Sequence, residues 1–157
     1  VSSAVLLEKF DTVELVEPCG SFLSKAAEEL PAHRVTAVHQ VNLQDFVPPP
    51  LSRFAAVWVQ WVLLYLTDSD IKIFLSRCAS AVAPGGYVIV KESVSRADSG
   101  FFVDKTDSSI TRTDEHFRAL FDDAGLKIAK TCLQGGMPAG LFAVRMYALR
   151  PLNDAVL

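Results

Sequence analysis

Apolar residues along the chain alternate between the spacing of strands and the spacing of helices. Four runs have the character of strands: residues 12–16, 34–41, 54–61 and 87–91. Four segments have apolar residues at every third or fourth position, and they begin after Ser2, Ser21, Thr67 and Thr113. Such spacing predicts helices. Helices and strands that take turns are typical of an α/β fold built around a mostly parallel sheet.

The connections add two loops and a hairpin to this pattern. Three successive prolines make residues 42–53 a loop, because proline cannot donate to a strand ladder. The polar stretch of residues 93–112 predicts a long loop of the kind that often carries function. Residues 126–133 and 141–149 are strand-like, and the short glycine-rich connection between them predicts an antiparallel hairpin. We therefore expect one α/β domain over residues 1–157 that ends in a hairpin.

Charge and hydropathy exclude several classes of partner. The chain has 15 basic and 18 acidic residues, so neither a nucleic-acid-binding surface nor an acidic tail is expected. The most apolar stretch, residues 54–66, is interrupted by Gln60 and bounded by Arg53 and Asp68. It is shorter than the roughly 18 residues that a membrane span requires. We expect a soluble monomer without direct nucleic-acid or membrane partners.

The cysteines indicate a reducing compartment. Cys19, Cys78 and Cys132 are widely spaced and form no metal-binding group with histidine, so no metal is expected. We interpret them as reduced thiols of the core, which fits the cytoplasm or the nucleus. The chain begins with Val1 and not with methionine, and this start is interpreted as a truncation.

Candidate functional residues are those just past each strand, because ligands of doubly wound sheets bind beyond the carboxyl ends of the strands. Glu17, followed by Pro18, ends the first strand. Its carboxylate suits the two hydroxyls of a ribose, and an ordinary surface charge is the alternative. Leu43 and Gln44 follow the second strand and suit an adenine ring, although taken alone they favour the alternative, a plain polar loop.

Two further clusters follow the later strands. Gln60 and Trp61 end an otherwise apolar strand, where they either wall a ligand site or belong to the core. The long loop carries Asp104, Asp107 and Ser109. Their carboxylates suit proton transfer or a cationic substrate, and turn formation is the alternative.

Together these residues resemble the protein α-N-terminal methyltransferases, which methylate the amino group of chains that begin Xaa-Pro-Lys. The resemblance covers nearly the whole chain. The Gln-Trp and Asp-x-x-Asp-Ser-Ser strings are specific, whereas the Pro-Gly-Gly turn is general to methyltransferases. The segments that carry the resemblance are residues 43–46, 58–62, 66–68, 84–86, 90–92, 104–109, Arg112 and 147–150.

The resemblance implies a cofactor, S-adenosylmethionine, with S-adenosylhomocysteine as its product. It makes Glu17 the ribose acid, with Pro18, Leu43 and Gln44 as further cofactor contacts. It makes Gln60 and Trp61 wall residues that the cofactor and the substrate share, so both also contact the cofactor. The residues implied to bind the substrate are Trp61, Tyr65, Asp104, Asp107 and Ser109. Asp104, Asp107 and Ser93 are the catalytic candidates, and Asp107 is preferred for deprotonation.

One position departs from the family pattern: Ser93 stands where many members have asparagine. The resemblance further implies a Rossmann-like class I methyltransferase sheet from which the first, central strand and its glycine-rich loop are absent. We expect a longer protein to supply both. Three functions are retained: a protein N-terminal methyltransferase that acts on N-terminal segments of proteins, a small-molecule methyltransferase, and a non-catalytic binding module of the same fold.

Overall fold

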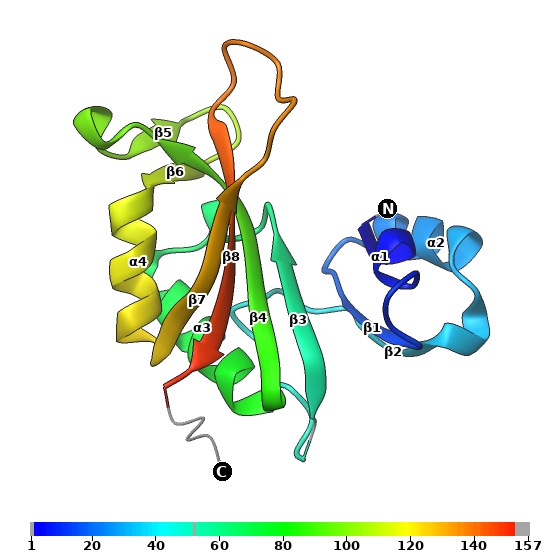
Figure 1. Ribbon diagram of the computed structural model, residues 1–157. Helices are drawn as coiled ribbons and strands as arrows, with labels where there is room; N and C mark the ends of the chain where they lie inside the picture. The colour runs from blue at the N-terminus through cyan, green and yellow to red at the C-terminus, as the bar shows by residue number, and fades with distance from the viewer. Residues whose placement is uncertain (1, 52, 153–157) are drawn as a thin grey trace. The chain divides into compact units, whose positions relative to one another are not determined.

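A computed structural model describes residues 2–51 and 53–152 of the chain (Figure 1). Val1, on which the interpretation of a truncated start rests, lies outside the described residues. The chain forms two compact units, Val1–Val47 and Pro48–Leu157. The first unit has a two-stranded sheet and the second has a six-stranded sheet.

The first unit consists of short helices packed on a pair of parallel strands. Its elements are α1 (Ser2–Leu6), β1 (Val13–Val16), α2 (Gly20–Glu29), the 3-10 turn η1 (Ala32–Arg34) and β2 (Val35–His39). Leu7, Ala26 and Leu30 are buried and pack against apolar side chains of both strands. Because β1 and β2 are parallel, their carboxyl ends lie at the same edge of this small sheet.

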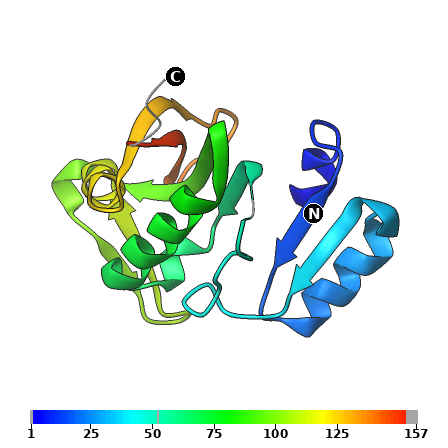
Figure 2. The same cartoon turned by 90° about the horizontal axis from the view of Figure 1, so that it is seen from below.

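The second unit is a mixed sheet with helices on one face. Its elements are β3 (Phe54–Gln60), η2 (Leu63–Tyr65), α3 (Asp68–Ala81), β4 (Val82–Ser95), η3 (Ala97–Ser99), β5 (Phe102–Asp104), β6 (Ser109–Thr113), α4 (Asp114–Asp123), β7 (Leu126–Leu133) and β8 (Ala143–Pro151). Helices α3 and α4 lie side by side against the sheet (Figure 2).

Strand β4 organises this sheet, because it pairs with three other strands. β3 lies parallel to β4 up to the pair of Gln60 with Lys91, and β8 lies antiparallel along the opposite edge. Beyond the end of β3, β6 takes over the same edge of β4 through the pairs of Val94 with Arg112 and Ser95 with Thr113. The carboxyl ends of β3 and β4 therefore lie beside the base of the β5–β6 hairpin, where β6 ends.

Both helices of the second unit begin at the residues that the sequence predicts. The side chain of Thr67 accepts a hydrogen bond from the Asp70 N–H at 3.2 Å, and the side chain of Thr113 accepts one from the His116 N–H at 3.1 Å. These bonds satisfy N–H groups that a helix leaves unpaired in its first turn. The C-terminal antiparallel hairpin is also confirmed, as β7 and β8 pair from Leu126 to Leu133.

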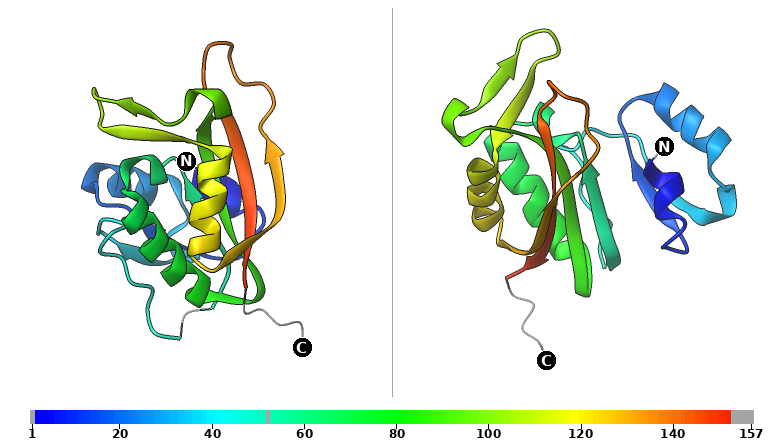
Figure 3. Two further views of the ribbon diagram at one scale, coloured as in Figure 1. Left: turned by 90° about the vertical axis from the view of Figure 1, so that its left-hand side faces the viewer. Right: turned by 45° about the horizontal axis from the view of Figure 1, so that its top comes forward.

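The prediction of one long loop over residues 93–112 is wrong, because residues 93–95, 102–104 and 109–112 belong to strands. β4 continues through Ser95, and β5 and β6 form an antiparallel hairpin that projects as an arm (Figure 3). Buried and less buried positions alternate along these strands, but many of the buried side chains are polar, so hydropathy does not indicate the alternation. Arg112 and Ser109, for example, are polar residues on a strand and both are buried.

The cysteine prediction holds at one position only. Cys78 is buried in α3, whereas Cys19 and Cys132 are exposed, so the interpretation of all three as core thiols is wrong. All three are free cysteines. Among the described residues, no helix is long and apolar enough to cross a membrane.

Candidate functional site

Glu17 and Pro18 lie in the turn that connects β1 to α2 in the first unit. The Glu17 N–H donates to the His39 carbonyl at 3.1 Å, which ties the end of β1 to the end of β2. Glu17 Oε1 accepts a hydrogen bond from the Cys19 N–H at 2.8 Å. This bond turns the carboxylate toward the start of α2 and leaves Oε2 without a hydrogen bond in the described part of the chain. The carboxylate is thus preoriented and retains acceptor capacity for a ligand.

Leu43 and Gln44 lie in the turn after β2, at the same edge of the first unit. Leu43 is half-buried and Gln44 is exposed. The turn is anchored by Phe46, which is buried and meets the His39 ring edge-on at 5.2 Å between centroids. The parallel strands therefore bring the predicted cofactor residues of this unit to one edge.

Gln60 and Trp61 lie at the carboxyl end of β3 in the second unit. The indole ring of Trp61 is 41% exposed, so it is not a core residue. The backbone N–H of Trp61 continues the ladder by donating to the Lys91 carbonyl at 3.1 Å, and the Lys91 ammonium lies 5.1 Å from the centroid of the indole ring. A cation at this distance stabilises the ring in place. Gln60 Oε1 accepts a hydrogen bond from the Trp58 indole at 3.0 Å, so the side chain of Gln60 is also oriented.

The segment after Trp61 turns back through η2 and exposes Tyr65, whose side chain is 55% exposed. Two buried charged residues surround this segment, Glu92 at the end of β4 and Arg112 on β6. Glu92 Oε1 accepts hydrogen bonds from the N–H groups of Val62 and Leu63, each at 2.9 Å. The backbone that carries Trp61 and Tyr65 is therefore bound to the core of the sheet.

Burial dominates the protonation of Glu92. It raises the pKa of Glu92 to about 7, although the hydrogen bonds from Leu63 and Val62 and the charge of Arg112 act in the opposite direction. The second oxygen, Oε2, is buried and has no hydrogen-bond partner among the described residues. A carboxylate in such surroundings is costly to ionise, because burial penalises the charged form.

Arg112 is buried and uses all three of its guanidinium nitrogens. Its Nη1 and Nη2 donate to the carbonyls of Leu63 and Leu66, at 3.3 and 2.7 Å, and its Nε donates to Asp68 Oδ1 at 2.8 Å. Asp68 Oδ2 in turn contacts His116 Nε2 at 2.8 Å. Burial works to raise the pKa of Asp68, but the hydrogen bonds from His116 and Arg112 outweigh it and hold that pKa below its ordinary value.

Asp104 and Asp107 shape the turn of the β5–β6 hairpin. Asp104 Oδ1 accepts from the Thr106 N–H at 2.8 Å, and Asp107 Oδ1 accepts from the Ser109 N–H at 3.0 Å. One oxygen of each aspartate thus stabilises the turn, which is one of the two interpretations of these residues. The second oxygen of each makes no hydrogen bond within the described residues and stays available to a ligand.

The remaining substrate-side candidates lie close to these elements. Ser109 is buried at the start of β6, opposite Asp104 in the strand pairing. Ser93 is partly buried on β4 and follows Glu92, so its side chain points to the opposite face of the sheet. No hydrogen bond joins Asp104 or Asp107 to the residues at the end of β3 within the described part of the chain.

The predicted residues fall into two groups, one in each compact unit. Glu17, Pro18, Leu43 and Gln44 belong to the first unit. The substrate-side set belongs to the second unit, where its members gather around the carboxyl ends of β3 and β4 and along the β5–β6 hairpin: Gln60, Trp61, Tyr65, Ser93, Asp104, Asp107 and Ser109.

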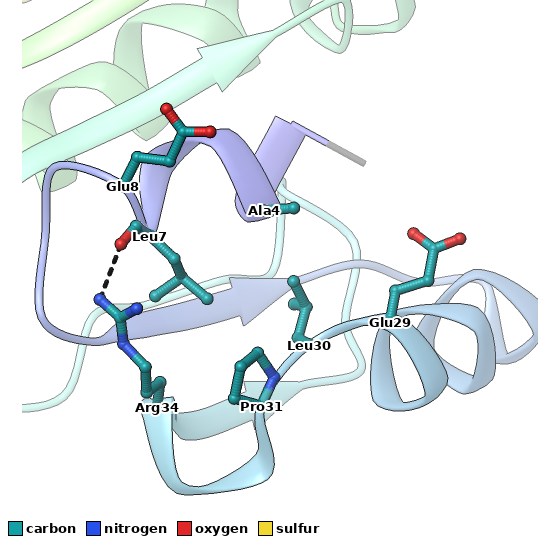
Figure 4. A pocket seen from close by; sticks show the side chains of 7 residues that line it. All are labelled: Ala4, Leu7, Glu8, Glu29, Leu30, Pro31 and Arg34. Atoms are coloured by element: carbon teal, nitrogen blue, oxygen red, sulfur yellow. Dashed lines mark hydrogen bonds between the residues drawn. The ribbon is translucent and has the colours of Figure 1, made fainter.

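A pocket in the first unit is lined by side chains from α1, the end of α2 and η1 (Figure 4). It lies between α1 and the start of β2, whereas Glu17 and Gln44 follow the carboxyl ends of their strands. Arg34 crosses it and donates from Nη2 to the Leu7 carbonyl at 2.7 Å. The residues that line it are Ala4, Leu7, Glu8, Glu29, Leu30, Pro31 and Arg34. Its position at the amino end of β2 separates it from the strand ends where ligands of such sheets bind.

Sequence reasoning assigned no role to Lys91, Glu92 or Arg112. A signal for Glu92 is present in the sequence, because the alternation of buried Val88 and Val90 continues directly to it. A carboxylate at a position that faces the core requires partners, and these partners lie far along the chain. The sequence gives no comparable indication that Arg112 is buried, because the polar stretch in which it lies predicts a loop.

Three comparisons connect the chain to known proteins. Residues 1–150 match a family described as AdoMet dependent proline di-methyltransferase. The Arabidopsis thaliana Alpha N-terminal protein methyltransferase 1 is 41% identical over 154 residues, which cover 95% of this chain and 55% of that protein. The Xenopus laevis N-terminal Xaa-Pro-Lys N-methyltransferase 1-B is 34% identical over 152 residues, which cover 96% of this chain and 67% of that protein.

The fold has a counterpart among solved structures. A SAM-dependent methyltransferase from Leishmania major superimposes with a TM-score of 0.87 at 34% identity, over 95% of this chain and 59% of that one. The chain spans about half the length of several curated relatives that it matches, with 55% of the Arabidopsis protein and 50% of a rice protein covered.

The buried Glu92 predicts a pH dependence of stability. Its folded pKa of about 7 exceeds the ordinary value of 4.5, so the folded state binds the proton more tightly than the unfolded state. The free energy of unfolding should therefore fall as pH rises from about 4.5 to about 7, by on the order of 3 kcal/mol from this group. Urea titrations between pH 4.5 and pH 8 measure it.

The variant Glu92→Gln should remove this contribution, because the amide keeps an acceptor oxygen but does not ionise. Glu28→Gln, which removes a charge from the exposed surface of α2, should keep the pH dependence of the wild type. The assignment is wrong when Glu92→Gln and the wild type lose stability in parallel over this pH range.

Proposed function

Because the chain belongs to the AdoMet-dependent proline di-methyltransferase family, we propose that the protein that contains it methylates the α-amino group of protein N-termini. The names of its relatives support protein N-termini as substrates, and the name of the Xenopus laevis relative supports the Xaa-Pro-Lys type. The likeness to a solved methyltransferase confirms the class I methyltransferase fold. The observation that carries the proposal is the exposed Trp61 held at the carboxyl end of β3, on the same unit as the free carboxylate oxygens of Asp104 and Asp107.

The first unit supplies residues that fit the nucleoside part of S-adenosylmethionine. Glu17 has one oxygen fixed by the Cys19 N–H, and its other oxygen accepts from the ribose hydroxyls in the proposed complex. Leu43 and Gln44, in the turn after β2, lie against the adenine, and Pro18 shapes the turn beside the ribose. When bound, the cofactor supplies an electrophilic methyl group on a sulfonium.

The second unit supplies the acceptor side in this proposal. Trp61 and Tyr65 form an aromatic wall for the substrate N-terminus, and Gln60 offers a neutral polar group beside it. Two exposed aromatic rings bury apolar area around an amine and exclude water. Ser93 and Ser109 contribute hydroxyl groups on the neighbouring strands, β4 and β6.

An amine attacks a methyl group only through its neutral form. The ordinary pKa of an α-amino group is about 8, so a useful fraction is neutral near pH 7.5 without strong activation. Holding the amine in line with the methyl group therefore provides most of the rate. Asp107 receives the proton through its free oxygen, and Asp104 binds the positive charge of the substrate peptide.

We further propose that a longer protein supplies one additional strand and the glycine-rich loop that follows it. Among the described residues, β1 pairs only with β2, and β3 pairs with β4 and has no partner on its other edge. Such edges leave backbone N–H and C=O groups without ladder partners. An additional strand satisfies groups of this kind, and the glycine-rich loop after it contributes to the cofactor site.

The cellular compartment follows from the cysteines in the same proposal. Cys19, Cys78 and Cys132 are all free, and two of them are exposed. Free exposed thiols persist in reducing compartments. We place the protein in the cytoplasm or the nucleus.

The proposed function predicts methyl transfer by the full-length protein from labelled S-adenosylmethionine to a peptide that begins Xaa-Pro-Lys. The same peptide with an acetylated α-amino group should receive no label, because its nitrogen has no nucleophilic lone pair. Mass spectrometry of both peptides measures the result. Label on a metabolite extract and not on the peptide favours a small-molecule methyltransferase, and absence of cofactor binding favours a non-catalytic module.

The role of Asp107 predicts a selective loss of rate. Asp107→Asn keeps an oxygen for the Ser109 N–H and so preserves the turn, but it cannot receive a proton. The value of kcat/KM for the peptide should fall by about 10-fold or more, while the affinity for the cofactor stays unchanged. The matched control is Asp98→Asn, which removes an exposed carboxylate from the neighbouring turn η3. Equal peptide kinetics in both variants would show that Asp107 only forms the turn.

A further inference from the structure

The backbone at Trp61 is held in an unfavourable conformation. Its φ angle is 51°, which lies in the left-handed region that residues other than glycine seldom adopt. Such a conformation persists where the surrounding structure enforces it. The cause must therefore lie in what binds the chain on either side of this residue.

Glu92 binds the chain immediately after Trp61. A single oxygen, Oε1, accepts both the Val62 and the Leu63 N–H, each at 2.9 Å. These are the first N–H groups of the turn that leads into η2, where a short helical segment has no backbone acceptor for them. The carboxylate thus fixes the direction in which the chain leaves β3.

Arg112 binds the far end of the same segment. It donates to the Leu63 and Leu66 carbonyls and is itself fixed by Asp68. The segment from Trp61 to Leu66 is therefore bound through its N–H groups by the buried carboxyl group of Glu92 and through its carbonyls by the buried guanidinium of Arg112. Tyr65 and Trp61 project from it with large exposed areas.

We propose that Glu92 is a positioning residue for the acceptor substrate, which sets the direction of Trp61 by holding the Val62 and Leu63 N–H groups. The inference rests on the proposed function, because it assigns Trp61 to the substrate wall. It also accounts for a costly feature of the core. Glu92 is 1% exposed, and its Oε2 has no hydrogen-bond partner among the described residues. An apolar side chain at this position avoids that cost but cannot hold the turn.

Matched substitutions separate positioning from general stability. Glu92→Met keeps the length of the side chain and removes the acceptor, whereas Glu92→Gln keeps an acceptor oxygen. Glu92→Asp keeps the charge but withdraws it by one methylene group. Val90→Ala is the control, since Val90 is fully buried on the same face of β4 and makes no hydrogen bond to the turn through its side chain.

The fluorescence of Trp61 measures its position without any reaction. The chain contains two tryptophans, so Trp58→Phe leaves Trp61 as the one that remains in it. Subtracting the spectrum of the Trp58→Phe, Trp61→Phe double variant isolates its emission in the full-length protein. We expect Glu92→Met and Glu92→Asp to shift this emission and to change its quenching by acrylamide. Glu92→Gln and Val90→Ala should leave both unchanged.

Kinetics of the full-length protein provide the second readout. In Glu92→Met, the KM for the acceptor peptide should rise by about 10-fold, with the KM for S-adenosylmethionine within about 2-fold of the wild type. Glu92→Asp should show the same split if Glu92→Met does not fold. The proposal is overturned if these variants match Val90→Ala in both Trp61 emission and acceptor KM. If the wild type methylates no peptide, the proposed function fails, and the emission of Trp61 alone then decides whether Glu92 positions it.

Discussion

The turn that carries Trp61 and Tyr65 depends on two ionisable side chains buried in the sheet, one on β4 and one on β6. Glu92 and Arg112 lie in the core of the second unit, each 1% exposed, and both bind the backbone between β3 and α3. Because buried side chains of the core bind these backbone groups, the turn has little freedom to move. The exposed Trp61 and Tyr65 thereby acquire fixed positions on an otherwise irregular segment, which is what an acceptor site requires.

The division of the candidate residues between two units follows from the topology of the sheet. Each parallel pair, β1 with β2 and β3 with β4, brings its following turns to one edge. The first pair gathers groups suited to a nucleoside, and the second gathers aromatic and acidic groups suited to an amine. In the proposed function these two sets have complementary roles, one toward the methyl donor and the other toward the acceptor.

Much of this arrangement follows from local sequence. The helices after Thr67 and Thr113 and the hairpin of β7 with β8 are readable because capping residues and apolar periodicity act over a few positions. Local sequence does not predict β6, the strand that carries Arg112. Its side chain is polar, and its burial depends on carbonyls at Leu63 and Leu66 that are far away in sequence. The roles of Glu92 and Lys91 could not be predicted from the sequence either, because both residues act on the turn that follows β3, about 30 positions earlier in the chain.

The most direct test is a crystal structure of the full-length protein with S-adenosylhomocysteine and an Xaa-Pro-Lys peptide. The ribose should lie on Glu17, and the peptide amino nitrogen should lie beside Trp61. A peptide bound away from Trp61 and from the β5–β6 hairpin would contradict it.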